Sequence, residues 1–311
     1  MVLDVQNVGR CAQPLITGQQ RAPILARAVK DLSSGEMGVA EYIGTHQPQP
    51  PRQPEQHTIG GKPGRINRAL DGILNHFAYS IAASITNALF EARPWPILRG
   101  RAMKEEQVTF LSGELTLEGM IAKSGSHVER GAVMCHPHPL YGGSMFNNVV
   151  EGALEAMWRL GWATLRFNFR GVGQSTGEHG GGIGEADDAA AAVRFLSEEL
   201  ATSPQTIVLG GYSFGAMAAM NAASKVHEPA ALILIALPLR MAPAGVLEQL
   251  NAPVILAAGD HDDYCPRVQF QALHETLGKR SQLAIIQGAD HFFGGYEADL
   301  ANALEGMIRN I

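Results

Sequence analysis

Short apolar segments alternate with longer segments of helical spacing from about residue 103 onward, and this alternation constrains the fold more than any other feature. Parallel strands joined by helices have both faces of their sheet covered, so their strands are compact apolar runs. The sequence therefore predicts an α/β fold, a mostly parallel sheet with helices on both faces. The expected strands are Val108–Leu111, Leu115–Ala122, Gly131–Cys135, Ala163–Phe169, Thr206–Leu209, Ala231–Leu237, Val254–Ala258 and Gln282–Ile286. The expected helices are Phe146–Leu160, Glu185–Leu200, Ala216–Val226, Pro266–Leu277 and Glu297–Ile308.

The charge of the chain changes at the same place. Residues 1–102 carry 11 Lys and Arg against 7 Asp and Glu, whereas residues 103–311 carry 13 against 23. We expect residues 1–66 to be a weakly structured extension rich in Pro and Gln, and residues 67–102 to hold one amphipathic helix and a Pro-rich connector. The apolar stripe of that helix, Leu70–Leu89, is expected to pack on a neighbouring domain, and a lid or an interfacial anchor is the alternative.

Composition excludes several classes of protein. The net charge of −6 argues against a nucleic-acid surface, and three scattered cysteines do not form a disulfide framework. The first ten residues lack the features of a secretory signal, and the uncharged stretch at residues 72–90 is too polar for a comfortable membrane span. We therefore expect a cytoplasmic protein with no integral membrane span, and homo-oligomerisation is left open.

A G-x-S-x-G motif lies between an expected strand and an expected helix. It runs from Gly211 to Gly215, with Ser213 at its centre. Small residues on both sides allow a tight strand–turn–helix connection, which holds the serine in a strained conformation with its hydroxyl exposed. The motif alone is common by chance in a chain with 35 glycines. Its position between strand and helix makes Ser213 the candidate nucleophile, and an idle serine in a small-residue turn is the alternative.

A serine nucleophile needs a base, and the base needs an acid that orients it. His291 follows the last expected strand and is the candidate base, since His274 lies within a helix and His261 lies in the acidic loop itself. That loop follows the strand Val254–Ala258, and Asp262 within it is the candidate acid. The acids considered as competitors are Asp260, Asp263 and Asp290.

Two backbone N–H groups are needed to stabilise the oxyanion of an acyl-transfer reaction. The first is expected from Phe214, directly after the nucleophile, and the second from the loop that follows Gly131–Cys135. Proline has no N–H, which excludes Pro137 and Pro139 as donors. His138 is the first choice, because it lies two residues after His136, the place of the donor in the commoner His-Gly-x loops, and Leu140 and Tyr141 are the alternatives.

The sequence gives less support to two other functions, metal binding and dinucleotide binding. His136 and His138 could share a metal ion, but further ligands at a suitable spacing are missing. The glycine-rich loop Gly171–Gly177 has Thr176 where a dinucleotide-binding motif needs its third glycine. We therefore expect neither a metal nor a cofactor.

Five segments together resemble the small bacterial α/β-hydrolases that lack a cap domain, a group similar to dienelactone hydrolases and short-chain carboxylesterases. The segments are HPHPLYGGSMFNN (136–148), LRFNFRGVGQSTG (165–177), GGYSFGA (210–216), GDHDDYCP (259–266) and GADHFF (288–293). The resemblance covers about residues 103–311 and implies an α/β-hydrolase fold, with Ser213, Asp262 and His291 as the triad. In dienelactone hydrolases proper the nucleophile is cysteine, whereas here it is serine. Met103, where such proteins tend to begin, is an alternative start of the chain.

The expected function is therefore hydrolysis of short-chain carboxylic esters, small-molecule substrates, through an acyl-enzyme. The alternatives are a peptidase or amidase with the same triad, a lipase or polyester hydrolase if the N-terminal helix is a lid, and a non-catalytic binding protein with this fold.

Overall fold

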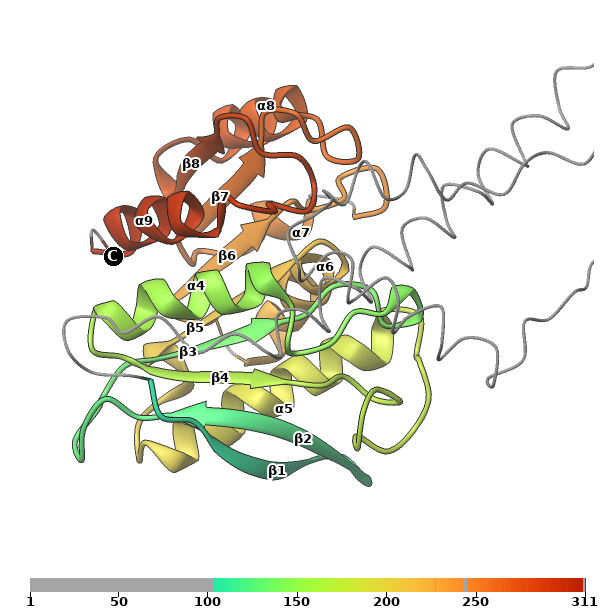
Figure 1. Cartoon of the computed structure of the whole chain (residues 1–311), viewed down its shortest axis with the longest axis vertical. Helices are drawn as coiled ribbons and strands as arrows, with labels where there is room; N and C mark the ends of the chain where they lie inside the picture. Colours follow the sequence, from blue (N-terminus) through green and yellow to red (C-terminus); the bar gives the residue numbers. More distant parts are fainter. Residues whose placement is uncertain (1–102, 227, 243–244, 310) are drawn as a thin grey trace, which may run out of the picture. The chain divides into compact units, whose positions relative to one another are not determined.

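The computed structural model describes residues 103–226, 228–242, 245–309 and 311 (Figure 1). The expected extension at residues 1–66 and the expected helix and connector at residues 67–102 lie outside the described residues. Within the described ranges, no helix combines the length and the apolar character that a membrane crossing requires.

One eight-stranded sheet organises the described part of the chain, in the order β1-β2-β4-β3-β5-β6-β7-β8. Strand β2 is antiparallel to β1 and to β4, and the other neighbouring pairs are parallel. The predicted α/β class with a mostly parallel sheet is confirmed. The strands are β1 (Glu106–Ser112), β2 (Leu115–Ala122), β3 (Gly131–Cys135), β4 (Ala163–Phe167), β5 (Ile207–Tyr212), β6 (Ala231–Ile235), β7 (Val254–Gly259) and β8 (Ser281–Ile286).

Helices cover both faces of this sheet (Figure 1). Helix α4 packs against α9, while α5 packs against α6, and α8 lies on β7 and β8. The helices are α4 (Asn148–Arg159), α5 (Ile183–Glu199), α6 (Phe214–Ala222), α7 (Gly245–Glu248), α8 (Arg267–Leu277) and α9 (Glu297–Ile308). Short 3-10 helices lie at Pro139–Tyr141, Pro204–Thr206, Ala223–Val226 and Gly278–Arg280.

The structure differs from the sequence prediction mainly where glycines lie next to the candidate nucleophile. Strand β5 continues through Gly210 and Gly211 to Tyr212, because both glycines pair with β3 on one side and with β6 on the other. Strands β4 and β6 each end two residues earlier than expected, and α6 begins two residues earlier. The short helix α7 was not predicted from the sequence.

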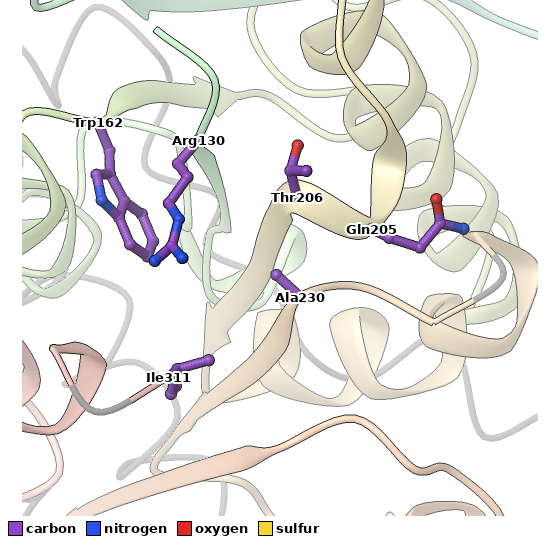
Figure 2. Close-up of a pocket in the computed structure, with 6 residues that line it drawn as sticks. All are labelled: Arg130, Trp162, Gln205, Thr206, Ala230 and Ile311. Carbon is purple, nitrogen blue, oxygen red and sulfur yellow. The ribbon is translucent and has the colours of Figure 1, made fainter.

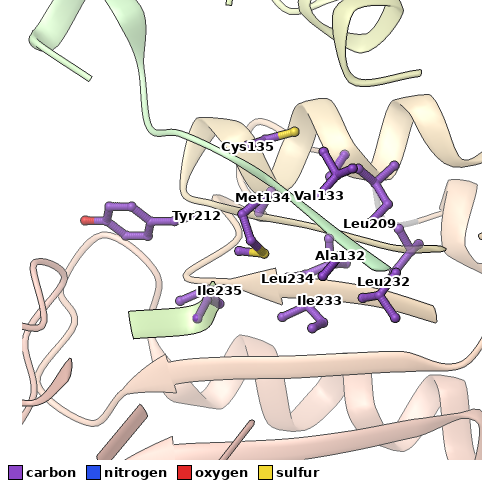
Figure 3. Close-up of a cluster of buried hydrophobic side chains, with 14 of the residues drawn as sticks. Ala132, Val133, Met134, Cys135, Leu209, Tyr212, Leu232, Ile233, Leu234 and Ile235 are labelled. Carbon is purple, nitrogen blue, oxygen red and sulfur yellow. The ribbon is translucent and has the colours of Figure 1, made fainter. Parts of the chain in front are cut away.

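The central strands carry the hydrophobic core. Every residue of β3, β5, β6 and β7 is buried, and the side chains of Val133, Leu209, Leu232 and Leu234 lie within one continuous cluster (Figure 3). Full burial of each large aliphatic side chain stabilises the fold by about 1.5–3 kcal/mol. Strand β5 is therefore rigidly held on both sides, and the residue that follows it, Ser213, starts from a fixed position.

Candidate active site

Ser213 lies in the sharp turn between β5 and α6. Its backbone has φ 54° and ψ −118°, and its N–H donates to the carbonyl oxygen of Ile235 at 2.9 Å. A Cβ atom on Gly215 would lie 2.3 Å from the carbonyl oxygen of Cys135, and one on Gly211 would lie 2.2 Å from the carbonyl oxygen of Gly215. Both flanking positions therefore require glycine, and the packed strands around them hold the serine in its strained conformation.

His291 and Asp262 meet Ser213 in a chain of hydrogen bonds. His291 follows β8 and is buried, with its Nε2 atom 3.1 Å from Ser213 Oγ and its Nδ1 atom 2.8 Å from Asp262 Oδ2. Asp262 follows β7, and its other oxygen, Oδ1, accepts the N–H groups of Tyr264 at 2.9 Å and Cys265 at 2.8 Å. The three residues predicted from sequence are thus brought together, and both oxygens of the carboxylate have partners.

The competing residues have other contacts. Asp260 Oδ1 accepts the N–H of Gly288 at 2.6 Å and so links the loop after β7 to the loop after β8. Asp290 Oδ1 accepts the N–H of Phe292 at 2.9 Å and so braces its own loop. Asp263 and His261 are exposed. His274 lies in α8, with its Nδ1 atom 2.8 Å from Ser281 Oγ.

The loop after β3 brings His138 beside the turn that holds Ser213. The ring of His138 lies 4.6 Å from the ring of Phe214. Of the alternative donors, Leu140 N–H donates to His138 Nδ1 at 3.3 Å and Tyr141 N–H donates to the His138 carbonyl oxygen at 3.1 Å. Both amides are therefore used within the turn itself. Phe214 is the first residue of α6, where backbone N–H groups have no carbonyl partner within the helix.

His136 is buried and links the loop after β3 to the loop after β4. Its Nδ1 atom lies 2.7 Å from the carbonyl oxygen of Pro137, and its Nε2 atom accepts the N–H of Phe169 at 3.0 Å. Burial lowers the pKa of His136 to about 4, so the ring is neutral at pH 7. Both ring nitrogens are thus engaged with the backbone, and His136 has no lone pair left for an ion shared with His138.

A second potential metal group, Asp262, Cys265 and His291, coincides with the hydrogen-bond chain. Its members already have partners, because Asp262 bonds to His291 and the Cys265 thiol lies 3.1 Å from the carbonyl oxygen of Ala236. Burial, and secondly the charge of Asp262, raises the pKa of the Cys265 thiol, which disfavours the thiolate that a metal needs.

The glycine-rich loop after β4 is also unsuited to a phosphate. The N–H of Gln174 donates to Glu118 Oε1 at 2.7 Å, so a carboxylate occupies the position that a phosphate would take. The N–H groups of Gly171 and Ser175 donate to carbonyl oxygens of the same loop.

Tyr212 is a site residue that the sequence analysis missed. Its buried hydroxyl donates to the carbonyl oxygen of His291 at 2.8 Å, and the two rings lie 5.4 Å apart. The available signal was the expectation that a buried tyrosine finds a partner for its hydroxyl. Sequence alone does not say which partner, since the two residues are 79 positions apart.

A pocket of about 240 Å³ lies at the opposite edge of the sheet, where the parallel strands begin (Figure 2). Its lining contains Arg130, whose guanidinium lies 5.5 Å from the ring centre of Trp162. The remaining lining residues are Gln205, Thr206, Ala230 and Ile311. This lining has no nucleophile paired with a base, so the candidate site is the edge that holds Ser213.

Comparison with known proteins decides the family. Residues 137–305, more than half of the chain, match a family model described as an alpha/beta hydrolase domain. The chain belongs to the alpha/beta hydrolase family. An uncharacterised protein from Rickettsia prowazekii, RP471, is 33% identical over 217 residues, which cover 66% of this chain and 89% of the relative.

Two solved structures of bacterial serine hydrolases are similar to this alpha/beta hydrolase. An alpha-beta serine hydrolase homologue from Coxiella burnetii has a TM-score of 0.60 and 33% identity, covering 68% of this chain and 99% of its own. XC6422 from Xanthomonas campestris, described as a serine hydrolase without lid, has a TM-score of 0.59 and 30% identity. The match covers 69% of this chain and 97% of the Xanthomonas chain. The expected resemblance to small cap-less bacterial α/β-hydrolases is confirmed, and family and neighbours support a hydrolase.

Proposed function

We propose that this protein is a carboxylesterase that cleaves short-chain esters through an acyl-enzyme. The observation that carries the proposal is the hydrogen-bond chain from Ser213 Oγ through His291 to the buried carboxylate of Asp262. A hydroxyl, an imidazole and a carboxylate in this order can form and then hydrolyse an acyl-serine.

In the first half-reaction, Ser213 Oγ attacks the ester carbonyl carbon while His291 Nε2 takes the hydroxyl proton. The carbonyl π electrons move to oxygen, and the resulting oxyanion accepts hydrogen bonds from the N–H groups of Phe214 and His138. The C–O bond to the alcohol then breaks, and His291 returns the proton to the departing alkoxide oxygen.

In the second half-reaction, His291 takes a proton from water, and the hydroxide attacks the acyl-serine. The second tetrahedral oxyanion collapses, the bond to Ser213 Oγ breaks, and the serine recovers its proton from His291. Asp262 keeps the Nδ1 proton of His291 in place and stabilises the imidazolium that forms in each step. The products are a carboxylic acid and an alcohol, with no oxidant or cofactor involved.

The preference for small acyl groups rests on the connections between the described strands, where no cap domain is inserted. The longest of these connections, residues 168–206 between β4 and β5, holds helix α5 and one short 3-10 helix besides loops, and the similar Xanthomonas campestris hydrolase is described as lacking a lid. An open site offers little enclosed surface for a long acyl chain. We also propose a cytoplasmic location, in keeping with Cys135 and Cys265 being buried free thiols.

A series of p-nitrophenyl esters from acetate to palmitate tests the function, with the wild type and Ser213→Ala assayed in parallel. The expected result is hydrolysis that is strongest for acetate and butyrate and absent in Ser213→Ala. Equal turnover by the variant would contradict the proposal. Activity only on aminoacyl amides would instead favour the amidase alternative.

A further inference from the structure

Large apolar side chains that are strongly exposed gather at one edge of the sheet. Six such side chains occur among the described residues, and five of them lie in segments that follow parallel strands. These five form what we call the apolar rim: Leu140 (66% exposed), Ile183 (77%), Met241 (68%), Tyr264 (55%) and Val268 (61%). The sixth, Leu111, lies on the edge strand β1 and is 68% exposed.

The strand order places the apolar rim on both sides of Ser213. Strand β5, which leads into Ser213, lies between β3 and β6. Ile183 and Leu140 follow β4 and β3 on one side, and the other three members follow β6 and β7 on the other side. All these segments begin at the carboxyl ends of parallel strands, the edge at which such sheets bind their ligands.

Contacts tie the apolar rim to the candidate site itself. The N–H of Leu140 donates to His138 Nδ1, and the ring of His138 lies against Phe214. On the other side, the ring centre of Tyr264 lies 5.0 Å from that of His291. Because His291 must return its proton to the departing alcohol, the alcohol leaves next to Tyr264.

Single exposed apolar residues are ordinary on protein surfaces, but a group of them in one place marks a binding surface. The partner must carry an ester that reaches Ser213, since the rim flanks the nucleophile. An anionic partner is disfavoured, because residues 103–311 carry 13 Lys and Arg against 23 Asp and Glu and would repel a negatively charged surface.

We propose that the apolar rim docks the protein on an uncharged, water-insoluble ester phase, such as dispersed short-chain esters of an apolar alcohol. The proposal rests on the esterase function above and extends it to how the substrate is presented. The side chains of the rim lose contact with water when they enter the ester phase, and Ser213 then faces esters at high local concentration.

Tributyrin tests the proposal, because it can be assayed both below and above its solubility limit. The quantity measured is the ratio of the initial rate on the emulsion to the rate on dissolved tributyrin. The wild type is expected to show a ratio well above one. Ile183→Gln/Val268→Gln, which alters both sides of the rim, is expected to lower the ratio about tenfold. Leu111→Gln, the matched control, should keep the wild-type ratio.

A wild-type rate that stays flat across the solubility limit would overturn the docking proposal, as would an unchanged ratio in the double variant. Adding an anionic phospholipid to the emulsion should lower the wild-type ratio, and a higher ratio would overturn the choice of an uncharged partner. The rate on dissolved tributyrin separates the two proposals. If the docking test fails while dissolved tributyrin is still hydrolysed, only the docking proposal is overturned. If no tributyrin is hydrolysed in either form, the esterase function itself is overturned.

Discussion

The Oδ2 atom of Asp262 lies 2.8 Å from the Nδ1 atom of His291. Because Oδ1 of the same carboxylate accepts two backbone N–H groups from its own loop, the carboxylate is fixed before it meets the imidazole. This contact keeps the His291 proton on Nδ1 and leaves Nε2 directed at Ser213 Oγ as an acceptor.

Asp262→Asn is expected to lower kcat by about 10³–10⁴-fold, because an amide can favour the wrong tautomer of His291. The variant is expected to keep the fold, since an amide oxygen can still accept the loop N–H groups. Steady-state kinetics on p-nitrophenyl butyrate measures the effect. Asp263→Asn, in the same loop but exposed, is the control and should resemble the wild type. A kcat within tenfold of wild type for Asp262→Asn would contradict the assigned role.

Tyr212→Phe removes the hydroxyl that donates to the carbonyl oxygen of His291. We expect the free energy of unfolding to fall by about 1–3 kcal/mol, because a buried carbonyl loses its partner. We also expect kcat to fall while KM is unchanged, since Tyr212 positions the base and does not contact the substrate. Urea denaturation and kinetics on the folded variant measure the two effects. Lower stability with an unchanged kcat would show that Tyr212 supports the fold alone.

Gly215→Ala tests the tight turn at the nucleophile. The new Cβ would lie 2.3 Å from a backbone oxygen of β3, so strand and helix must move apart. We expect loss of at least about 3 kcal/mol of stability, together with loss of activity. Gly306→Ala in α9 is the matched control: nothing lies within 4 Å of its Cβ, and alanine should stabilise the helix by up to about 1 kcal/mol. Thermal unfolding distinguishes the two, and equal melting temperatures would contradict the packing argument.

His136 gives the fold a defined dependence on pH. Its pKa is about 4 in the folded protein against an ordinary value of 6.5, so the unfolded chain binds more protons between these values. The contribution of neutral His136 to the free energy of unfolding is therefore fully present above pH 6.5. It declines as the pH falls toward 4, by at most about 1.4 kcal/mol per pH unit.

His136→Gln has no such proton to bind, and its unfolding free energy should depend less on pH in that window. At pH 7 the variant should be the less stable protein, because the hydrogen bond from Phe169 N–H is weakened or lost. The difference from wild type should narrow as the pH falls, as measured by urea denaturation at several pH values. Parallel curves for the two proteins would contradict the buried neutral state of His136.

Sequence was sufficient to predict the sheet and to select Ser213, Asp262 and His291 for physical reasons. Fully buried parallel strands are compact apolar runs, as in Ala231–Ile235, and the residues that follow such strands converge at one edge of the sheet. Once the strands were placed, few polar residues remained at that edge that could serve as nucleophile, acid and base.

Other features depend on contacts that sequence patterns do not encode. The glycines before Tyr212 indicated the end of a strand, yet pairing with both neighbouring strands extends β5 through them. The hydrogen bond from Tyr212 to His291 joins distant positions, and the carboxylate of Asp262 is held by backbone groups whose sequence identity is irrelevant. The apolar rim likewise emerges only when exposure is known, because Ile183 and Val268 lie on helices that also carry buried apolar residues.

The most direct test of the central claim is labelling with a fluorophosphonate, followed by intact mass measurement and peptide mapping. The expected result is one covalent adduct per chain on Ser213. The adduct should be absent in Ser213→Ala and should form much more slowly in His291→Ala, because the hydroxyl then lacks its base. An adduct on a different residue, or a folded wild type that does not react, would contradict the proposal that Ser213 is the nucleophile.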